Sequence, residues 1–195
     1  MMAKKVIGVL ALQGNFSAHS AMLQRLNAEV KLIKLPQQLS SLDGLIIPGG
    51  ESTTMSKQIT SSDAWLTAFN HLYEKRLPVF GTCAGLILMS KHIQPKQFNL
   101  HWLDMVVQRN GYGRQIDSHF SKATFVVHGK EKLIEMPLIR APKILSIGQA
   151  VTPLIQEEKQ IYLVEQQHLL AATFHPEMTK QIDIHAYFLE KITKQ

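Results

Sequence analysis

In the first half of the chain, short apolar runs alternate with segments in which apolar residues recur at helical spacing. The apolar runs have the length of buried strands and are Val6–Leu12, Ala28–Leu35, Gly44–Ile47 and Pro78–Gly81. The helical segments are Phe16–Leu26, Ser61–Lys75 and Ala84–Ser90. Nearly continuous apolar strands that alternate with helices predict a parallel sheet covered on both faces.

The pattern changes between Phe98 and Ala172, where short β-like stretches follow one another. They are Ala123–Val127, Ile144–Ile147, Ile161–Val164 and Leu169–Thr173. These stretches predict antiparallel or mixed additions to the sheet, and Ile182–Ile192 predicts a closing helix. The expected class is α/β: a three-layer fold with a mixed, mostly parallel central sheet covered by helices. We find no repeat or linker and expect one domain over residues 1–195.

Charge and hydropathy argue against two classes of partner. The chain has 21 Lys and Arg against 15 Asp and Glu, a net charge of +6. Basic residues never run beyond the adjacent pairs Lys4-Lys5 and Lys75-Arg76, whereas a nucleic-acid binder concentrates its charge. No stretch approaches the roughly 18 apolar residues of a membrane helix, and the first apolar run ends without a signal-cleavage pattern. We therefore expect a cytoplasmic protein with neither nucleic acid nor membrane as a partner.

The chain has a single cysteine, which excludes a disulfide framework and a Cys-rich zinc site. Cys83 lies between a predicted strand and a predicted helix in the run Gly81-Thr82-Cys83-Ala84-Gly85, the thiol version of a nucleophile elbow. The sharp turn needs small residues two positions to either side. The helix N-terminus favours a thiolate and an oxyanion beside it. A buried structural cysteine is the alternative, and the flanking glycines favour the nucleophile.

A thiol nucleophile needs a base, and one histidine has a suitable context. His175 follows the stretch Leu169–Thr173 and stands in the run His175-Pro176-Glu177. Side chains two residues apart point the same way in an extended segment, so Glu177 could orient the imidazole while its other nitrogen faces Cys83. Alone, this run would indicate a surface ion pair. With an elbow cysteine it predicts a triad in the chain order Cys, His, Glu.

A glycine-rich loop, Pro48-Gly49-Gly50-Glu51-Ser52, follows the strand Gly44–Ile47. It would lie at the carboxyl edge of the sheet, where such folds place ligands. Gly49 and Gly50 can present backbone N–H groups to a carboxylate or an oxyanion. The alternative is a plain turn before a helix capped by Ser52. No metal is expected, and a surface or structural role is the expectation for His19, His71, His92, His101, His119, His128, His168 and His185.

In this order the motifs resemble the triad-type (class I) glutamine amidotransferases. The closer resemblance is to the PdxT family, the glutaminase subunits of pyridoxal 5′-phosphate synthase. The stretches that carry it span nearly the whole chain and are Gly8–Gly14, Gly44–Met55, Pro78–Leu86, Arg109–Gln115, Ile139–Pro142 and Phe174–Glu177.

The resemblance implies a flavodoxin-like glutaminase architecture and hydrolysis of L-glutamine to glutamate and ammonia through a thioester, without a cofactor. It implies Cys83 as nucleophile, His175 as base and Glu177 as the group that orients His175. The oxyanion donors would be the backbone N–H groups of Gly50 and Ala84. The implied glutamine-binding positions are Gly50, Glu51, Ser52, Arg109, Ile139 and Arg140.

The resemblance also implies a partner. In the family, ammonia passes to a synthase subunit that makes pyridoxal 5′-phosphate, within a large hetero-oligomer, and partner docking completes the oxyanion hole. The runs Ser118–Ser121 and Glu165–His168 depart from the family pattern, which concerns the interface rather than the triad. Two alternatives stay open: a glutaminase subunit of another biosynthetic pathway, and a non-catalytic thiol-sensing relative of the same fold.

Overall fold

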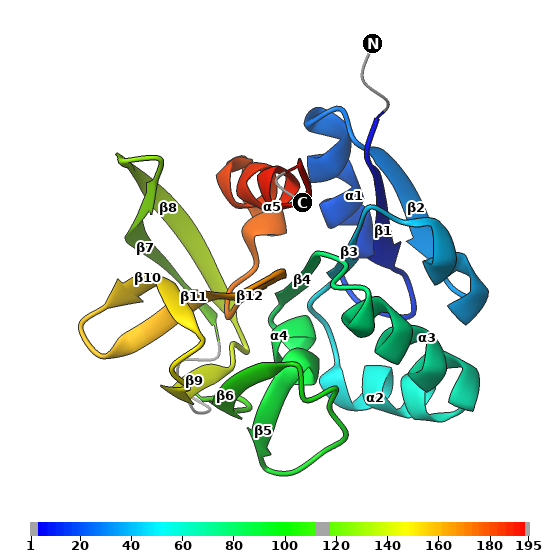
Figure 1. The fold of residues 1–195 in the computed structure, drawn as a ribbon. Helices are drawn as coiled ribbons and strands as arrows, with labels where there is room; N and C mark the ends of the chain where they lie inside the picture. Colours follow the sequence, from blue (N-terminus) through cyan, green and yellow to red (C-terminus); the bar gives the residue numbers. More distant parts are fainter. Residues whose placement is uncertain (1–3, 112–117, 194–195) are drawn as a thin grey trace.

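A seven-stranded sheet runs through the centre of the computed structural model, which describes residues 4–111 and 118–193 (Figure 1). Its strands are, in spatial order, β10 (Thr152–Glu157), β11 (Gln160–Gln166), β12 (Leu169–Ala172), β4 (Val79–Thr82), β3 (Gly44–Ile47), β1 (Val6–Leu10) and β2 (Glu29–Ile33). The five strands from β12 to β2 are parallel, and β11 and β10 add to one edge in antiparallel pairing. The mixed, mostly parallel sheet expected from the sequence is confirmed.

Helices cover both faces of this sheet. One face carries α1 (Phe16–Arg25) and α5 (Asp183–Thr193). The other carries η1 (Pro36–Ser41), α2 (Ser52–Thr60), α3 (Asp63–Glu74) and α4 (Ala84–Met89). Strand β3 supplies both cores, because Ile46 packs with the first group while Leu45 and Ile47 pack with the second. Three layers result, as predicted.

Two small sheets flank the central one. Strands β5 (Ser90–Gln94), β6 (Leu103–Gln108) and β9 (Lys143–Ile147) form one, and it packs with the α2–α4 layer. The hairpin of β7 (Ser118–Val127) and β8 (Lys130–Ile139) packs on the side of α5. The sequence pattern did not predict β5, β6, β8 or β10. These strands have polar or partly exposed positions, so no unbroken apolar run marks them in the sequence.

The helix starts show which residues act as caps. The Ser62 hydroxyl accepts a hydrogen bond from the Ala64 N–H at 3.2 Å, so Ser62 caps α3. Ser52 does not cap α2, because Glu51 occupies the cap position. Ser52 is instead the first helical residue, and its hydroxyl donates to Gln97 Oε1 at 3.2 Å.

Phe69 offers a test of the α3 core. It is fully buried, and its ring lies 5.8 Å from Trp65 and 5.9 Å from Trp102 between centroids. Phe69→Ala should lower the free energy of unfolding by about 3–5 kcal/mol in urea titrations, because it leaves a cavity. The matched change Phe120→Ala, at a side chain that is 73% exposed, should shift it by less than about 0.5 kcal/mol. Equal losses for the two variants would contradict this assignment of the core.

Candidate active site

Cys83 occupies a strained turn between β4 and α4, with φ +46° and ψ −98°. Both flanking glycines are required there. A Cβ at Gly81 would lie 2.5 Å from Met89 Sδ, and one at Gly85 would lie 2.0 Å from the Ile47 carbonyl oxygen. The thiol is 5% exposed, and its Sγ lies 4.0 Å from the Ile139 carbonyl oxygen. The sharp elbow expected from the sequence is thus present, with the backbone strain that this turn type requires.

His175 and Glu177 follow the neighbouring strand β12. His175 Nδ1 lies 2.8 Å from Glu177 Oε1, and both side chains are buried. The contact forms in a different way from the one expected, because residues Pro176–Met178 make a short 3₁₀ turn, η2, rather than an extended segment. The tight turn brings the carboxylate back onto the ring, and Nε2 remains for the Cys83 thiol.

The surroundings of the pair favour its charged form. Burial disfavours an imidazolium at His175, but its hydrogen bonds with Cys83 and Glu177 and their negative charge prevail and raise its pKa to about 10. Burial likewise opposes a charge on Glu177, but His19 and the hydrogen bond with His175 lower its pKa to about 2. At neutral pH the pair is therefore an imidazolium and a carboxylate.

The glycine-rich loop packs directly against the pair. A Cβ at Gly49 would lie 2.3 Å from His175 Cε1, and one at Gly50, where φ is +152°, would lie 2.7 Å from Gln13 Oε1. The Gly49 N–H donates to Thr82 Oγ1 at 3.0 Å, so the expectation that both glycines present free donors is wrong for Gly49. Ala84 is the first residue of α4, so its N–H has no partner within the helix.

A cavity of about 910 Å³ opens onto Cys83 and His175. Every other predicted site residue except Ala84 and Glu177 also lines it: Gly50, Glu51, Ser52, Arg109, Ile139 and Arg140. Ala84 and Glu177 lie behind the two reactive side chains and are buried. The cavity wall further contains four residues that the motifs did not assign to the site: Gln13, Asn15, Ile87 and Asn110.

Charged side chains of both signs stand at this cavity. Arg140 Nη1 lies 3.5 Å from Glu51 Oε1, and both side chains are largely exposed. Arg109 donates from Nη2 to Thr53 Oγ1 at 2.9 Å, which fixes its guanidinium over the start of α2. One cation and one anion within reach of each other suit a zwitterionic ligand. The rest of the Arg109–Gln115 motif, from Tyr112 onward, lies outside the described residues.

Three buried residues near the triad stand outside the predicted site: Thr82, and His19 and His185, for which a surface or structural role was expected. A signal for His19 was present, since it stands three and four residues before Met22 and Leu23 on the buried stripe of α1. The run Glu165–His168, which departs from the family pattern, does not line the cavity. Glu165 there binds Tyr187 and Lys191, at 2.8 and 2.7 Å.

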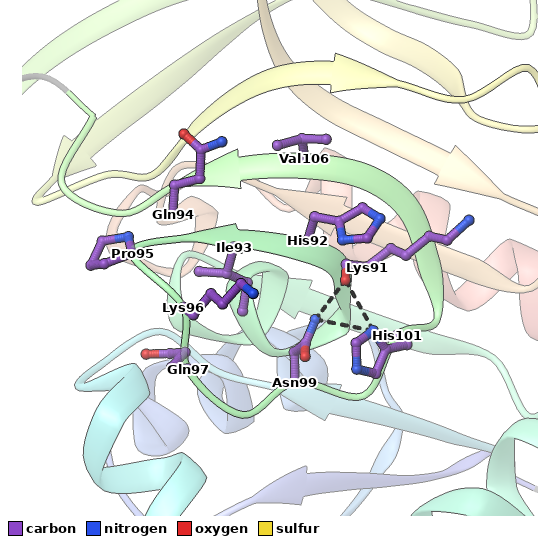
Figure 2. Close-up of a pocket in the computed structure, with 10 residues that line it drawn as sticks. All are labelled: Lys91, His92, Ile93, Gln94, Pro95, Lys96, Gln97, Asn99, His101 and Val106. Atoms are coloured by element: carbon purple, nitrogen blue, oxygen red, sulfur yellow. Dashed lines mark hydrogen bonds between the residues drawn. The ribbon is translucent and has the colours of Figure 1, made fainter.

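A second cavity, of about 770 Å³, lies beside β5 and the loop that leads to β6 (Figure 2). Asn99 and His101 line it and bind the Lys91 carbonyl oxygen, and none of the predicted site residues lines it.

Within residues 4–111 and 118–193, no three His, Cys, Asp or Glu side chains are grouped to hold a metal ion. Over the same residues no helix is long and apolar enough to cross a membrane.

Comparison with known proteins identifies the class. A solved structure described as a glutamine amidotransferase superposes with a TM-score of 0.88 at 37% identity, covering 96% of this chain and 98% of that one. The architecture is therefore that of a glutamine amidotransferase. More particularly, the chain belongs to the SNO glutamine amidotransferase family, whose family model matches residues 9–194.

Curated relatives cover almost the whole chain. One from Thermosipho africanus is 41% identical over 96% of this chain and 99% of its own length, and one from Streptococcus pneumoniae strain CGSP14 is 44% identical over 94% and 95%. Both are named pyridoxal 5′-phosphate synthase subunit PdxT. A solved structure from Thermoplasma acidophilum, described as a putative GMP synthase protein, shares the fold with a TM-score of 0.68 at 18% identity, over 100% of this chain and 96% of that one.

The buried histidines predict how stability depends on pH. Burial lowers the pKa of His185 to about 3 and that of His168 to about 4, from 6.5. Below pH 6.5 the unfolded chain binds protons that the folded chain does not, so stability falls as the pH decreases. Urea unfolding at pH 7 and 4.5 should show this decline, and His168→Leu should make it shallower. The exposed control His71→Leu should not alter it, and a decline that His168→Leu leaves unchanged would contradict the assignment.

Proposed function

We propose that this chain hydrolyses L-glutamine to glutamate and ammonia with Cys83 as nucleophile, His175 as acid and base, and Glu177 as the orienting carboxylate. The observation that carries the proposal is the elbow thiol beside a buried His–Glu pair, at the floor of a cavity with charges of both signs. Membership in a glutamine amidotransferase family supports the same chemistry.

The reaction follows from the charge state of the pair. The Cys83 thiolate attacks the side-chain amide carbon of glutamine, and the backbone N–H groups of Gly50 and Ala84 stabilise the oxyanion. The His175 imidazolium gives its proton to the amide nitrogen, the C–N bond breaks, and ammonia leaves a thioester. His175 then takes a proton from water, the hydroxide attacks the thioester, and glutamate departs as the thiolate and imidazolium form again.

The rest of the cavity recognises the α-amino acid end of glutamine. Arg109 and Arg140 complement the α-carboxylate, and Glu51 complements the α-ammonium group. Gly50, Ser52 and Ile139 complete the wall. Glutamine would thus lie with its side-chain amide toward Cys83 and its charged end toward solvent, where Arg140 and Glu51 are exposed.

The ammonia has a receiver in this proposal, a synthase subunit that makes pyridoxal 5′-phosphate. The PdxT names of relatives that match nearly the whole chain support this assignment. We infer that the two subunits form a hetero-oligomer in the cytoplasm, with residues 1–195 as one glutaminase domain. No cofactor enters the glutaminase step.

The nucleophile is tested by Cys83→Ala. This variant should lose glutamine hydrolysis completely, because the chain has no second thiol to replace the nucleophile. Ammonia release is measured with the candidate synthase subunit present, together with glutamine-dependent formation of pyridoxal 5′-phosphate by absorbance. A folded Cys83→Ala protein with undiminished ammonia release would refute the proposal. Labelling by peroxide but not by a glutamine-like diazo-ketone would favour a thiol sensor.

The glutamine-binding assignment is tested by Arg140→Ala. Loss of a charged hydrogen-bond donor should raise KM for glutamine by about 10- to 100-fold and leave kcat within about threefold. The matched control is Arg25→Ala, at an arginine that binds the Lys180 carbonyl oxygen and does not line the cavity. Steady-state kinetics with the synthase subunit separate the two constants, and an unchanged KM in Arg140→Ala would remove Arg140 from the binding site.

A further inference from the structure

Behind the triad lies a buried polar cluster that the proposed chemistry does not use. His19 of α1 is fully buried, and its Nδ1 lies 2.9 Å from His185 Nε2. Its Nε2 lies 3.1 Å from Thr82 Oγ1 and 3.3 Å from Glu177 Oε2. This carboxylate oxygen has no hydrogen-bond partner among the described residues. The His19 ring is therefore the polar group that faces the second oxygen of Glu177.

The neighbouring charge selects the tautomer of His19. A bare Nε2 would point its lone pair at the Glu177 carboxylate, which is unfavourable, whereas Nε2–H presents a positive edge to it. With the proton on Nε2, Nδ1 is an acceptor, and His185 Nε2–H is placed to donate to it. Each ring therefore keeps one N–H. His185 donates to His19, and the His19 Nε2–H points toward Thr82 Oγ1 and lies beside Glu177 Oε2.

Both rings are neutral at neutral pH. Burial lowers the pKa of His19, and the nearby His175 lowers it further, against the opposite effect of Glu177. Burial, His19 and Arg25 lower the pKa of His185 to about 3, against Glu177. The cluster therefore adds no net charge beneath the triad, and acts through oriented N–H groups.

Thr82 extends the cluster to the glycine-rich loop. Its Oγ1 accepts the Gly49 N–H at 3.0 Å and also receives His19 Nε2–H. One hydroxyl oxygen thereby joins the loop that carries Gly50 to the ring that faces Glu177. The α1 start reinforces this arrangement, because the Asn15 side chain donates to Glu177 Oε1 at 3.3 Å and its backbone N–H donates to the Gly49 carbonyl oxygen at 3.2 Å.

We propose that His19 is a positioning residue of the glutaminase. Its neutral imidazole presents the positive Nε2–H edge to Glu177 and donates to Thr82, which holds the Gly49–Gly50 loop, while His185 fixes its tautomer. This inference rests on the proposed function, because its effect on turnover passes through the triad. His19 does not line the cavity, so it acts without touching glutamine.

The first test compares His19→Leu with His19→Gln, whose amide nitrogen can replace the Nε2 donor. Leu at this position should lower kcat by about 10- to 100-fold with KM nearly unchanged, because it removes the donor to Thr82 and the N–H edge that faces the Glu177 carboxylate. Gln should restore most of kcat, as a neutral donor suffices. The matched control is His168→Leu, at another buried histidine whose ring nitrogens have no hydrogen-bond partner among the described residues. Failure of Gln to restore activity would overturn the neutral-donor role.

The second test needs neither glutamine nor the synthase subunit. Alkylation of the single thiol by iodoacetamide, followed by mass spectrometry across pH 5 to 9, reports the thiolate that the His175 imidazolium stabilises. His19→Leu should slow alkylation below pH 7 relative to the wild type, while His168→Leu keeps the wild-type profile. A slowed profile in a protein that does not hydrolyse glutamine would reject the proposed function and keep the buried cluster. Unchanged kcat and an unchanged profile would overturn the inference.

Thr82 gives a variant pair that retains the shape of the core. Thr82→Val replaces the hydroxyl with a methyl group of similar volume and leaves the Gly49 N–H without its acceptor, whereas Thr82→Ser keeps the oxygen. We expect kcat to fall about tenfold or more in the valine variant and to stay within about threefold in the serine variant. Thermal unfolding of both variants shows that they fold. Equal activities would remove the link between the loop and the cluster.

Discussion

The tight passage from β4 into α4 is the constraint on which the site depends. The positive φ of Cys83 is a conformation that costs a non-glycine residue about 1–3 kcal/mol. It persists because Gly81 and Gly85 let the elbow approach Met89 and the Ile47 carbonyl oxygen closely. The turn therefore requires β3 beside β4, and β3 itself ends in the glycine-rich loop. On the other side, β12 delivers His175. Three adjacent parallel strands thus supply the thiol, the loop and the imidazole at one carboxyl edge.

The charge on Glu177 explains why polar groups lie in the core here. A buried carboxylate without partners is strongly unfavourable. His175 and Asn15 meet one of its oxygens, and the His19 ring faces the other. The partners come from α1 and from the residues after β12, so formation of the charged pair requires the helix layer as well as the sheet edge. The opposite side of the triad faces an open cavity with exposed charges, which leaves room for a zwitterionic substrate.

The fold could be predicted for the strands whose hydrophobic pattern in the sequence matches their burial in the folded protein. The central parallel strands are buried on both faces, so β3 and β4 appear in the sequence as nearly unbroken apolar runs. Strands at the periphery have one exposed side and mixed composition; β5 contains Lys91 and His92, and its only buried apolar side chain is that of Ile93. Their side chains meet neighbours of mixed polarity, so no regular apolar alternation marks them as strands. The Thermoplasma acidophilum protein shares the fold at 18% identity, so most residues of this sequence can change while the architecture is kept.

The site divides in the same way between residues that a motif names and residues that only packing brings together. Cys83 and His175 stand in short runs whose chemistry is visible one segment at a time. In the sequence, Thr82 is only the residue between Gly81 and Cys83, and no motif assigns it a function. In the structure its hydroxyl oxygen contacts both the Gly49 N–H and the His19 ring. His19 lay on an apolar helical stripe, which predicts burial but gives no partner. Because most buried polar groups are hydrogen-bonded, burial at that position favoured a polar group across the interface. The groups found there are Thr82 of β4 and His185 of α5, and the carboxylate of Glu177 lies beside them.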